Sequence, residues 1–128
     1  MIALEVPTAV EFEALYATTG WGEHDRSVFE RALAGSWLVA TARRDGQLIG
    51  IGRVISDGAM HAFITEMIVA PEARGAGIGA ELVHALVSAC AERGITDVQL
   101  FAATGRRAFY ERNGFAARPE DAPGMQLR

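Results

Sequence analysis

The sequence predicts a single domain of the α/β class over residues 1–128, built on a mixed central sheet. Half of the 128 residues are hydrophobic, which is enough for one core and too few for two domains. A hairpin pattern over residues 36–55 predicts neighbouring antiparallel strands. A strand–helix–strand pattern over residues 60–102 predicts a right-handed parallel crossover. A chain with both kinds of pairing has a mixed sheet.

Two helices are predicted before the hairpin. Thr8 is a candidate N-cap, and Glu11 three residues later completes a capping box ahead of apolar residues at helical spacing, which stop before Gly20. The second helix is expected within residues 21–35, with Gly35 as its stop.

The hairpin turns at Asp45 and Gly46, and a second turn is expected at residues 56–58. The β-rich stretch 60–71, ended by Pro71, predicts a long strand buried on both faces. These segments supply three consecutive strands to the sheet.

A glycine-rich stretch opens the crossover helix, which ends at Gly94. Residues 95–102 alternate as a strand, and 105–114 form a short helix closed by asparagine and glycine. Residues 115–119 and 124–128 are predicted to be closing strands.

Composition excludes several functions. All twelve basic residues are arginine, which removes the lysine of a P-loop and any Schiff-base lysine. A net charge of −4 argues against a nucleic-acid binder. No apolar run is long enough to span a membrane, and the acidic start lacks the basic region of a secretory signal, so we expect a cytoplasmic protein. Cys90 is expected in the core, and no residue set has metal-ligand spacing, so no metal is expected.

The glycine-rich stretch is compatible with three interpretations. Glycines at a helix start let backbone N–H groups converge on a phosphate. Gly75, Gly77 and Ala80 fit a dinucleotide fingerprint, but the next strand does not end in the acidic residue that would bind ribose. A turn without a ligand is the third interpretation. The sequence therefore favours a phosphate site of a different kind.

The stretch "EMIVAPEARGAGIGAEL", residues 66–82, resembles motif A of the GCN5-related N-acetyltransferase (GNAT) superfamily. Its core pattern, [Q/R]-x-x-G-x-[G/A], is matched by Arg74, Gly75, Ala76, Gly77, Ile78 and Gly79. The stretch "AFYERNGF", residues 108–115, resembles motif B of the same superfamily. The resemblance implies the GNAT fold, with about six to seven strands and about four helices in the order β-α-α-β-β-β-α-β-α-β.

The resemblance also implies that acetyl-CoA is a co-substrate. The residues it assigns to the cofactor are Met67, Ile68, Val69, Arg74, Gly75, Ala76, Gly77, Ile78, Gly79 and Phe109. The backbone of the long strand would bind pantetheine as an added strand. The oxyanion would be stabilised by the backbone N–H of Ile68 or Val69. In the superfamily the motif A strand and the next strand splay apart around the thioester.

Tyr110 matches the tyrosine of motif B and is the candidate acid for the thiolate, with packing as the alternative. Glu66 is the only carboxylate inside the long strand; it is a candidate base, and an ion pair with Arg53 is the equal alternative. Trp21 and Phe63 are candidate walls of the acceptor site, although core packing is the commoner fate of such residues.

The resulting hypothesis is direct transfer of an acetyl group to a primary amine of a small molecule or peptide, in a ternary complex. A catalytically silent acyl-CoA sensor of the same fold is the alternative. The resemblance also makes a homodimer a possibility, and no nucleic-acid or membrane partner is expected.

Overall fold

The computed structural model describes all residues from 1 to 128. Its elements are β1 (Ile2–Leu4), α1 (Ala9–Tyr16), α2 (Arg26–Ala34), β2 (Leu38–Arg44), β3 (Gln47–Ser56), β4 (His61–Val69), a short 3-10 turn (Pro71–Ala73), α3 (Ile78–Glu92), β5 (Asp97–Leu100) and α4 (Arg107–Arg112). The five strands form one sheet in the order β1-β2-β3-β4-β5. The first four strands pair antiparallel, whereas β5 pairs parallel to β4, so the sheet is mixed.

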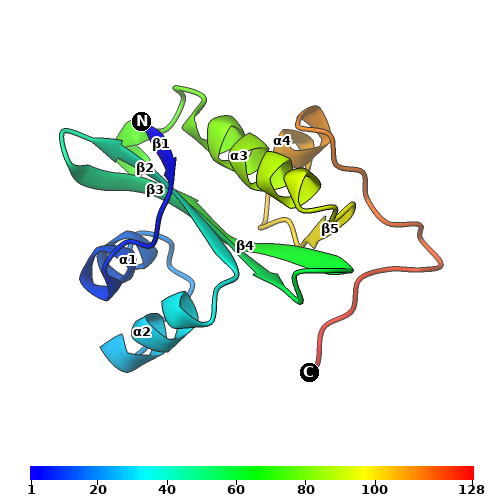
Figure 1. Ribbon diagram of the computed structural model, residues 1–128, viewed down its shortest axis with the longest axis horizontal. Coiled ribbons are helices and arrows are strands. Elements are labelled where there is room, and N and C mark those ends of the chain that lie inside the picture. The colour runs from blue at the N-terminus through cyan, green and yellow to red at the C-terminus, as the bar shows by residue number, and fades with distance from the viewer.

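Helices cover both faces of this sheet. Figure 1 shows α1 and α2 on one side of the strands and α3 on the other. From α3, Leu82 and Leu86 are fully buried, and Phe12 of α1 and Phe29 of α2 are buried on the opposite face. The sheet is therefore the middle layer of a three-layer α/β domain.

The helix cap of α1 and the hairpin turn form as the sequence predicts, whereas α2 begins later than expected. The Thr8 hydroxyl accepts from the Glu11 backbone N–H and the Glu11 carboxylate accepts from the Thr8 backbone N–H, which completes the capping box. α2 begins only at Arg26, after Asp25, so residues 21–25 belong to the connection between the helices, which spans residues 17–25. The hairpin turn places Asp45 and Gly46 at φ 52° and 80°, as a type I′ turn requires.

The predicted strand count was wrong, because the sheet has five strands rather than six to seven. Residues 115–119 and 124–128 form no ladder and lie mostly exposed. Pro119, at the end of the first segment, and Pro123, just before the second, cannot donate backbone hydrogen bonds, which disfavours a ladder at these positions. Figure 1 shows this carboxy-terminal segment running away from the sheet, and the outer edge of β5 has no partner strand.

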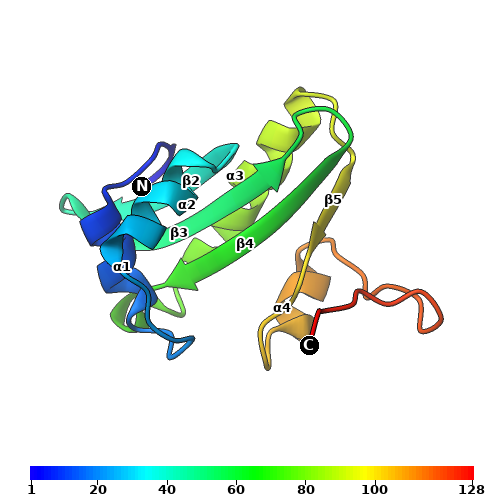
Figure 2. The same cartoon turned by 90° about the horizontal axis from the view of Figure 1, so that it is seen from below.

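Strands β4 and β5 separate along their length. They pair only from His61 with Asp97 to Ile64 with Leu100, and the rest of β4 has no partner on that side. In Figure 2 the two strands diverge, with α4 at the wide end of the gap. The gap leaves backbone groups of residues 65–69 unpaired by β5.

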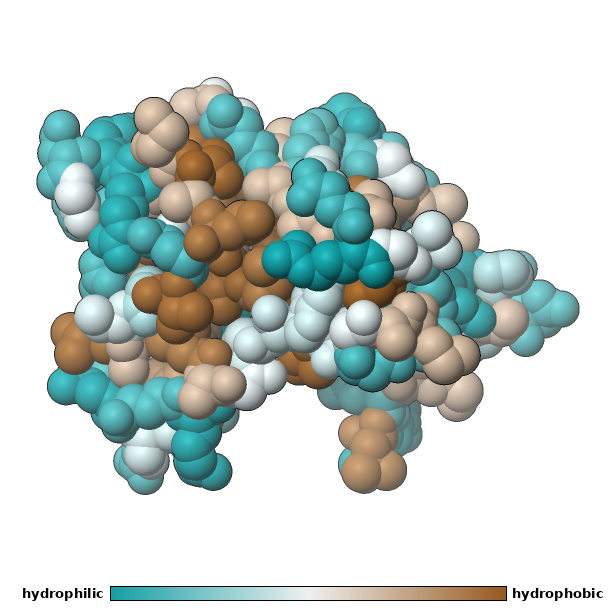
Figure 3. All heavy atoms as spheres, viewed as in Figure 1, coloured by the Kyte–Doolittle hydropathy of each residue, from teal (hydrophilic) through white to brown (hydrophobic).

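The outer surface is largely polar on the face drawn in Figure 3. An apolar area lies left of centre in this view, and a separate apolar tip lies at the bottom. The exposed large apolar residues near the two ends of the chain include Leu4, Val6 and Leu127. No helix is long and apolar enough to cross a membrane.

Candidate active site

A cleft of about 700 Å³ lies at the wide end of the gap between β4 and β5. It is bounded by β4, the loop before α3, the first turn of α3, α4 and the loop between α1 and α2. Its lining residues are Thr19, Trp21, Met67, Ile68, Val69, Ala73, Arg74, Gly75, Gly77, Ile78, Gly79, Ala80, Ala103, Thr104, Arg106, Phe109, Tyr110, Arg112 and Asn113. Most of the predicted cofactor residues are therefore brought together in one place; Ala76 does not line the cleft.

The start of α3 presents a run of free backbone donors. The first α3 residue with a helical acceptor is Glu81, whose N–H donates to the Gly77 carbonyl at 3.1 Å. The N–H groups of residues 78–80 therefore have no partner within the helix. The N–H groups of residues 75–77 donate to no acceptor in the protein. A run of free N–H groups at a helix start, supported by the helix dipole, is an anion-binding geometry.

Glycine is required in this run for two different reasons. Gly77 caps α3 at φ 81° in the left-handed region, and a Cβ there would meet nothing within 4 Å. Gly77 also lines the cleft, so its backbone is accessible to a ligand. At Gly79 a Cβ would come within 3.2 Å of the Phe109 ring, so a bare backbone lets α4 pack against α3.

The open edge of β4 is the second binding element. The Ala70 N–H donates to Ile49 of β3 at 2.8 Å, and N–H groups alternate in direction along a strand. The backbone N–H and carbonyl of Ile68 therefore point toward β3, whereas those of Met67 and Val69 point toward the cleft. The Val69 carbonyl accepts from Arg74 Nε at 3.2 Å on that side. Of the two N–H groups predicted for an oxyanion, this geometry favours that of Val69.

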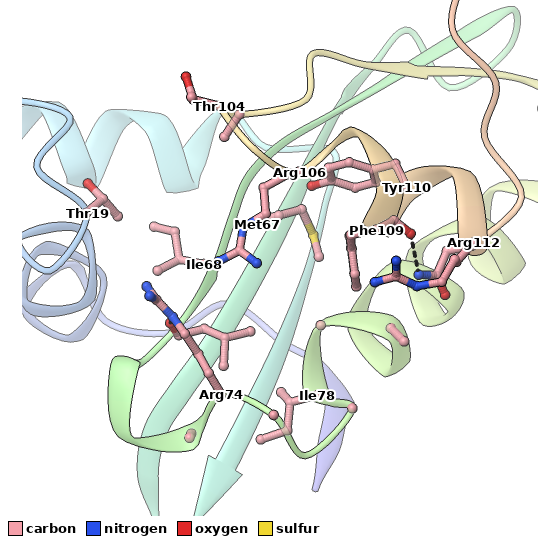
Figure 4. Close-up of a pocket in the computed structure, with 18 of the residues that line it drawn as sticks. Thr19, Met67, Ile68, Arg74, Ile78, Thr104, Arg106, Phe109, Tyr110 and Arg112 are labelled. Carbon is pink, nitrogen blue, oxygen red and sulfur yellow. Dashed lines mark hydrogen bonds between the residues drawn. The ribbon is translucent and has the colours of Figure 1, made fainter.

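Tyr110 is buried in α4, and its side chain reaches into the cleft. Only 9% of the residue is exposed, its ring packs edge-on against Phe109 and Phe115, and its hydroxyl makes no hydrogen bond within the protein. Figure 4 shows the hydroxyl directed into the cleft toward Arg106. Burial raises the pKa of the Tyr110 phenol above its ordinary value, and the Arg106 charge partly offsets the rise. The phenol is therefore a protonated donor at neutral pH.

The charged side chains of the cleft are all cationic. Arg74, Arg106 and Arg112 line it, and no carboxylate does. Figure 4 shows Arg106 and Arg74 directed toward the same open space beside Ile68. The protein carries a net charge of −4, so positive charge is concentrated in this cleft and favours an anionic ligand.

The two candidate acceptor residues lie in different places. Trp21 is 46% exposed, lines the cleft and packs edge-on against Tyr16. Phe63 does not line the cleft; its ring packs against Phe101 at 5.1 Å, beside β5. The structure therefore brings Trp21, but not Phe63, to the cofactor residues.

Glu66 is also outside the cleft. Arg53 Nε of the neighbouring strand donates to Glu66 Oε1 at 2.8 Å, which is the ion pair that the sequence left as an alternative. Glu66 has φ 49°, an unusual value for a residue with a Cβ. The Glu66 carboxylate therefore lies in an ion pair outside the cleft, whereas Tyr110 lines the cleft.

Sequence reasoning missed several lining residues. Thr19 and Thr104 lie in loops where no motif marks them, and Arg112 follows the tyrosine of α4 by two positions. Spacing along the helix did not reveal Arg112 either, because residues two positions apart on a helix do not share a face.

Comparison with known proteins identifies the family. The model of the Acetyltransferase (GNAT) family matches residues 6–115. The chain is 32% identical over 135 residues to GCN5-related N-acetyltransferase 2, chloroplastic, of Arabidopsis thaliana, covering 90% of this chain and 52% of that protein. It is 32% identical over 126 residues to the Glycine max protein named histone acetyltransferase TAP1, covering 90% and 54%.

Solved structures share the fold. A crystal structure of a protein from methicillin-resistant Staphylococcus aureus superimposes with a TM-score of 0.89 at 24% identity, covering 100% of this chain and 98% of that one. The chain belongs to the GNAT family of acetyltransferases. It spans about half the length of the first curated relatives that it matches.

Proposed function

We propose that the protein is an acetyl-CoA-dependent N-acetyltransferase that acts on a primary amine of a small molecule or a peptide. One observation carries the proposal: residue 75 and residues 77–80, whose N–H groups are free, line the same cleft as the open edge of β4 and Tyr110. The first element suits a pyrophosphate, the second an extended amide chain and the third a departing thiolate. Membership of the GNAT family supports this combination.

Binding would use the backbone more than side chains. The N–H groups of residues 75–80 would hold the pyrophosphate, with Arg74 and Arg112 adding charge. Met67 and Val69 would pair with the amides of pantetheine along the strand edge that β5 leaves open. Phe109 would pack beside the ligand from α4. A lysine is not needed, because the helix start supplies the donors.

The chemistry would need few side chains. Acetyl-CoA supplies an activated acetyl group when bound. The amine nitrogen bonds to the acetyl carbon, and the carbon–sulfur bond breaks. The Val69 N–H would stabilise negative charge on the acetyl oxygen, and the Tyr110 hydroxyl would give its proton to the departing sulfur. The cleft contains no carboxylate or histidine, so the amine proton would leave through water.

The acceptor end of the cleft would be formed by Trp21 and Thr19 on one side and Thr104 on the other. A half-exposed tryptophan gives a flat apolar wall that suits the carbon chain beside an amine. The soybean relative is named a histone acetyltransferase, which supports a peptide amine as one acceptor class. A small amine fits the same opening.

The decisive experiment mixes the protein with acetyl-CoA and a panel of small amines and peptides, and follows the release of CoA thiol. We expect acetyl-CoA to raise the thermal unfolding midpoint and at least one amine to release thiol. Absence of any thermal shift would contradict the acetyl-CoA site. Binding without thiol release from any amine would instead support a binding-only protein.

A further inference from the structure

Glu66 forms a bulge in the strand that borders the cleft. Arg53 of β3 pairs with Thr65 and Ile51 with Ile68, so β4 has one residue more than β3 over this span. The extra position carries the left-handed backbone of Glu66, at φ 49°. Residues with a Cβ rarely adopt this conformation unless their surroundings hold them there.

Arg53 is the group that holds the bulge. Its Nε donates to Glu66 Oε1 at 2.8 Å, and its Nη1 donates to Ser36 Oγ at 3.2 Å and to the Ala32 carbonyl at 3.4 Å. Ala32 lies in the last turn of α2, and Ser36 follows that helix. One guanidinium therefore connects the end of α2 to the bulge, and the side chains of Arg53 and Glu66 are only 14% and 22% exposed.

The bulge decides which backbone groups reach the cleft. Because N–H groups alternate along a strand, one extra residue reverses their direction beyond it. With the bulge in place, the backbone of Met67 and Val69 faces the cleft and that of Ile68 faces β3. Through Arg53 the Glu66 side chain is linked to the end of α2, and its charge, together with burial, raises the pKa of the Tyr16 phenol.

We infer that Arg53 and Glu66 are positioning residues, which fix the β4 bulge to the end of α2 and so direct the Met67 and Val69 backbone at the acetyl group. The inference rests on the proposed function. Glu66 then acts by holding Arg53 in place rather than by accepting the proton of the amine. Because the two side chains act as one unit, loss of either should have the same effect as loss of both.

The test compares Arg53→Met, Glu66→Gln and the double variant in the thiol-release assay. Small displacements of reacting groups can cost up to about a hundredfold in rate. We expect each single variant to lower kcat about tenfold, and the double variant to lower it no further, because coupled residues are not additive. The shape of the pH–rate profile should persist. Arg26→Met is the matched control, since its ion pair with Glu13 at 2.7 Å lies on an exposed surface.

Two outcomes would overturn the inference. Glu66 would be the general base if Glu66→Gln lowered kcat about a hundredfold or more and removed the acidic limb of the pH–rate profile, while Arg53→Met kept a kcat near that of the wild type. If all three variants had lower thermal unfolding midpoints but an unchanged kcat, the pair would stabilise the fold without positioning the reacting groups.

Amide hydrogen exchange separates this inference from the proposed function, because it needs no activity. Arg53→Met should speed exchange of the Ile68 and Ala70 amides, which face β3, relative to wild type and Arg26→Met, even if no acetyl-CoA binds. Unchanged exchange there would show that Arg53 does not hold the bulge. Failure of acetyl-CoA to bind the wild-type protein would instead remove the proposed function.

Discussion

Substitution of Gly77 tests the anion-binding start of α3 most directly. Gly77 has φ 81° and open space at its Cβ position, so the Cβ of an alanine or a glutamate would meet no neighbouring atom. Both variants bear the same backbone strain, about 1 to 3 kcal/mol for a residue with a Cβ in the left-handed region. Gly77→Ala is therefore the matched control, and the difference between the variants isolates the carboxylate.

The expected effect on binding follows from the added charge. A carboxylate about 5 Å from a phosphate, at an effective dielectric constant of about 20, costs roughly 3 kcal/mol. Since about 1.4 kcal/mol is a tenfold change in affinity, Gly77→Glu should bind acetyl-CoA roughly a hundredfold more weakly than Gly77→Ala.

Isothermal titration calorimetry with acetyl-CoA measures this difference, with unfolding midpoints recorded to confirm that both variants fold. The difference should shrink in about 0.5 M salt, because salt screens charge repulsion. If the two variants bind acetyl-CoA within threefold of each other, the start of α3 does not hold the phosphates.

Three further predictions concern the cleft and the fold. Tyr110→Phe should lower kcat by about a hundredfold while acetyl-CoA affinity stays within about threefold, measured by thiol release and calorimetry. Because burial raises the pKa of Tyr110, the wild-type enzyme should lose this acid at a higher pH than an ordinary phenol would. Trp21→Ala should raise KM for the amine and leave acetyl-CoA affinity unchanged, and a change confined to acetyl-CoA affinity would contradict its acceptor role. Arg43 lowers the Glu11 pKa to about 2, so their ion pair stabilises the fold above the ordinary pKa of 4.5 and is lost as pH falls toward 2. Arg43→Met should accordingly lower the urea midpoint at pH 7 and have little effect near pH 2, and an equal effect at both pH values would rule out this explanation.

The elements that sequence predicted well have local causes. The capping box at Thr8, the turn at Asp45 and Gly46 and the glycine run before α3 each need particular residues at fixed short spacings. The closing strands were wrong because a strand also needs a partner. Residues 115–128 have some β-forming composition, but two prolines interrupt them and no ladder to β5 forms.

By itself, the sequence determined where the free backbone N–H groups before α3 lie and that Tyr110 is the tyrosine of the later helix, because glycine spacing and helix starts are local properties of the chain. Only the tertiary structure decided which side of β4 each residue faces. A single extra residue at Glu66 reverses that direction, and its partner Arg53 lies thirteen residues earlier, on another strand. Tertiary packing likewise placed Trp21, in the loop between α1 and α2, at the cleft, and Phe63 of β4 against Phe101. A strand's pattern of residue types cannot specify such directions, since they depend on pairing between distant segments.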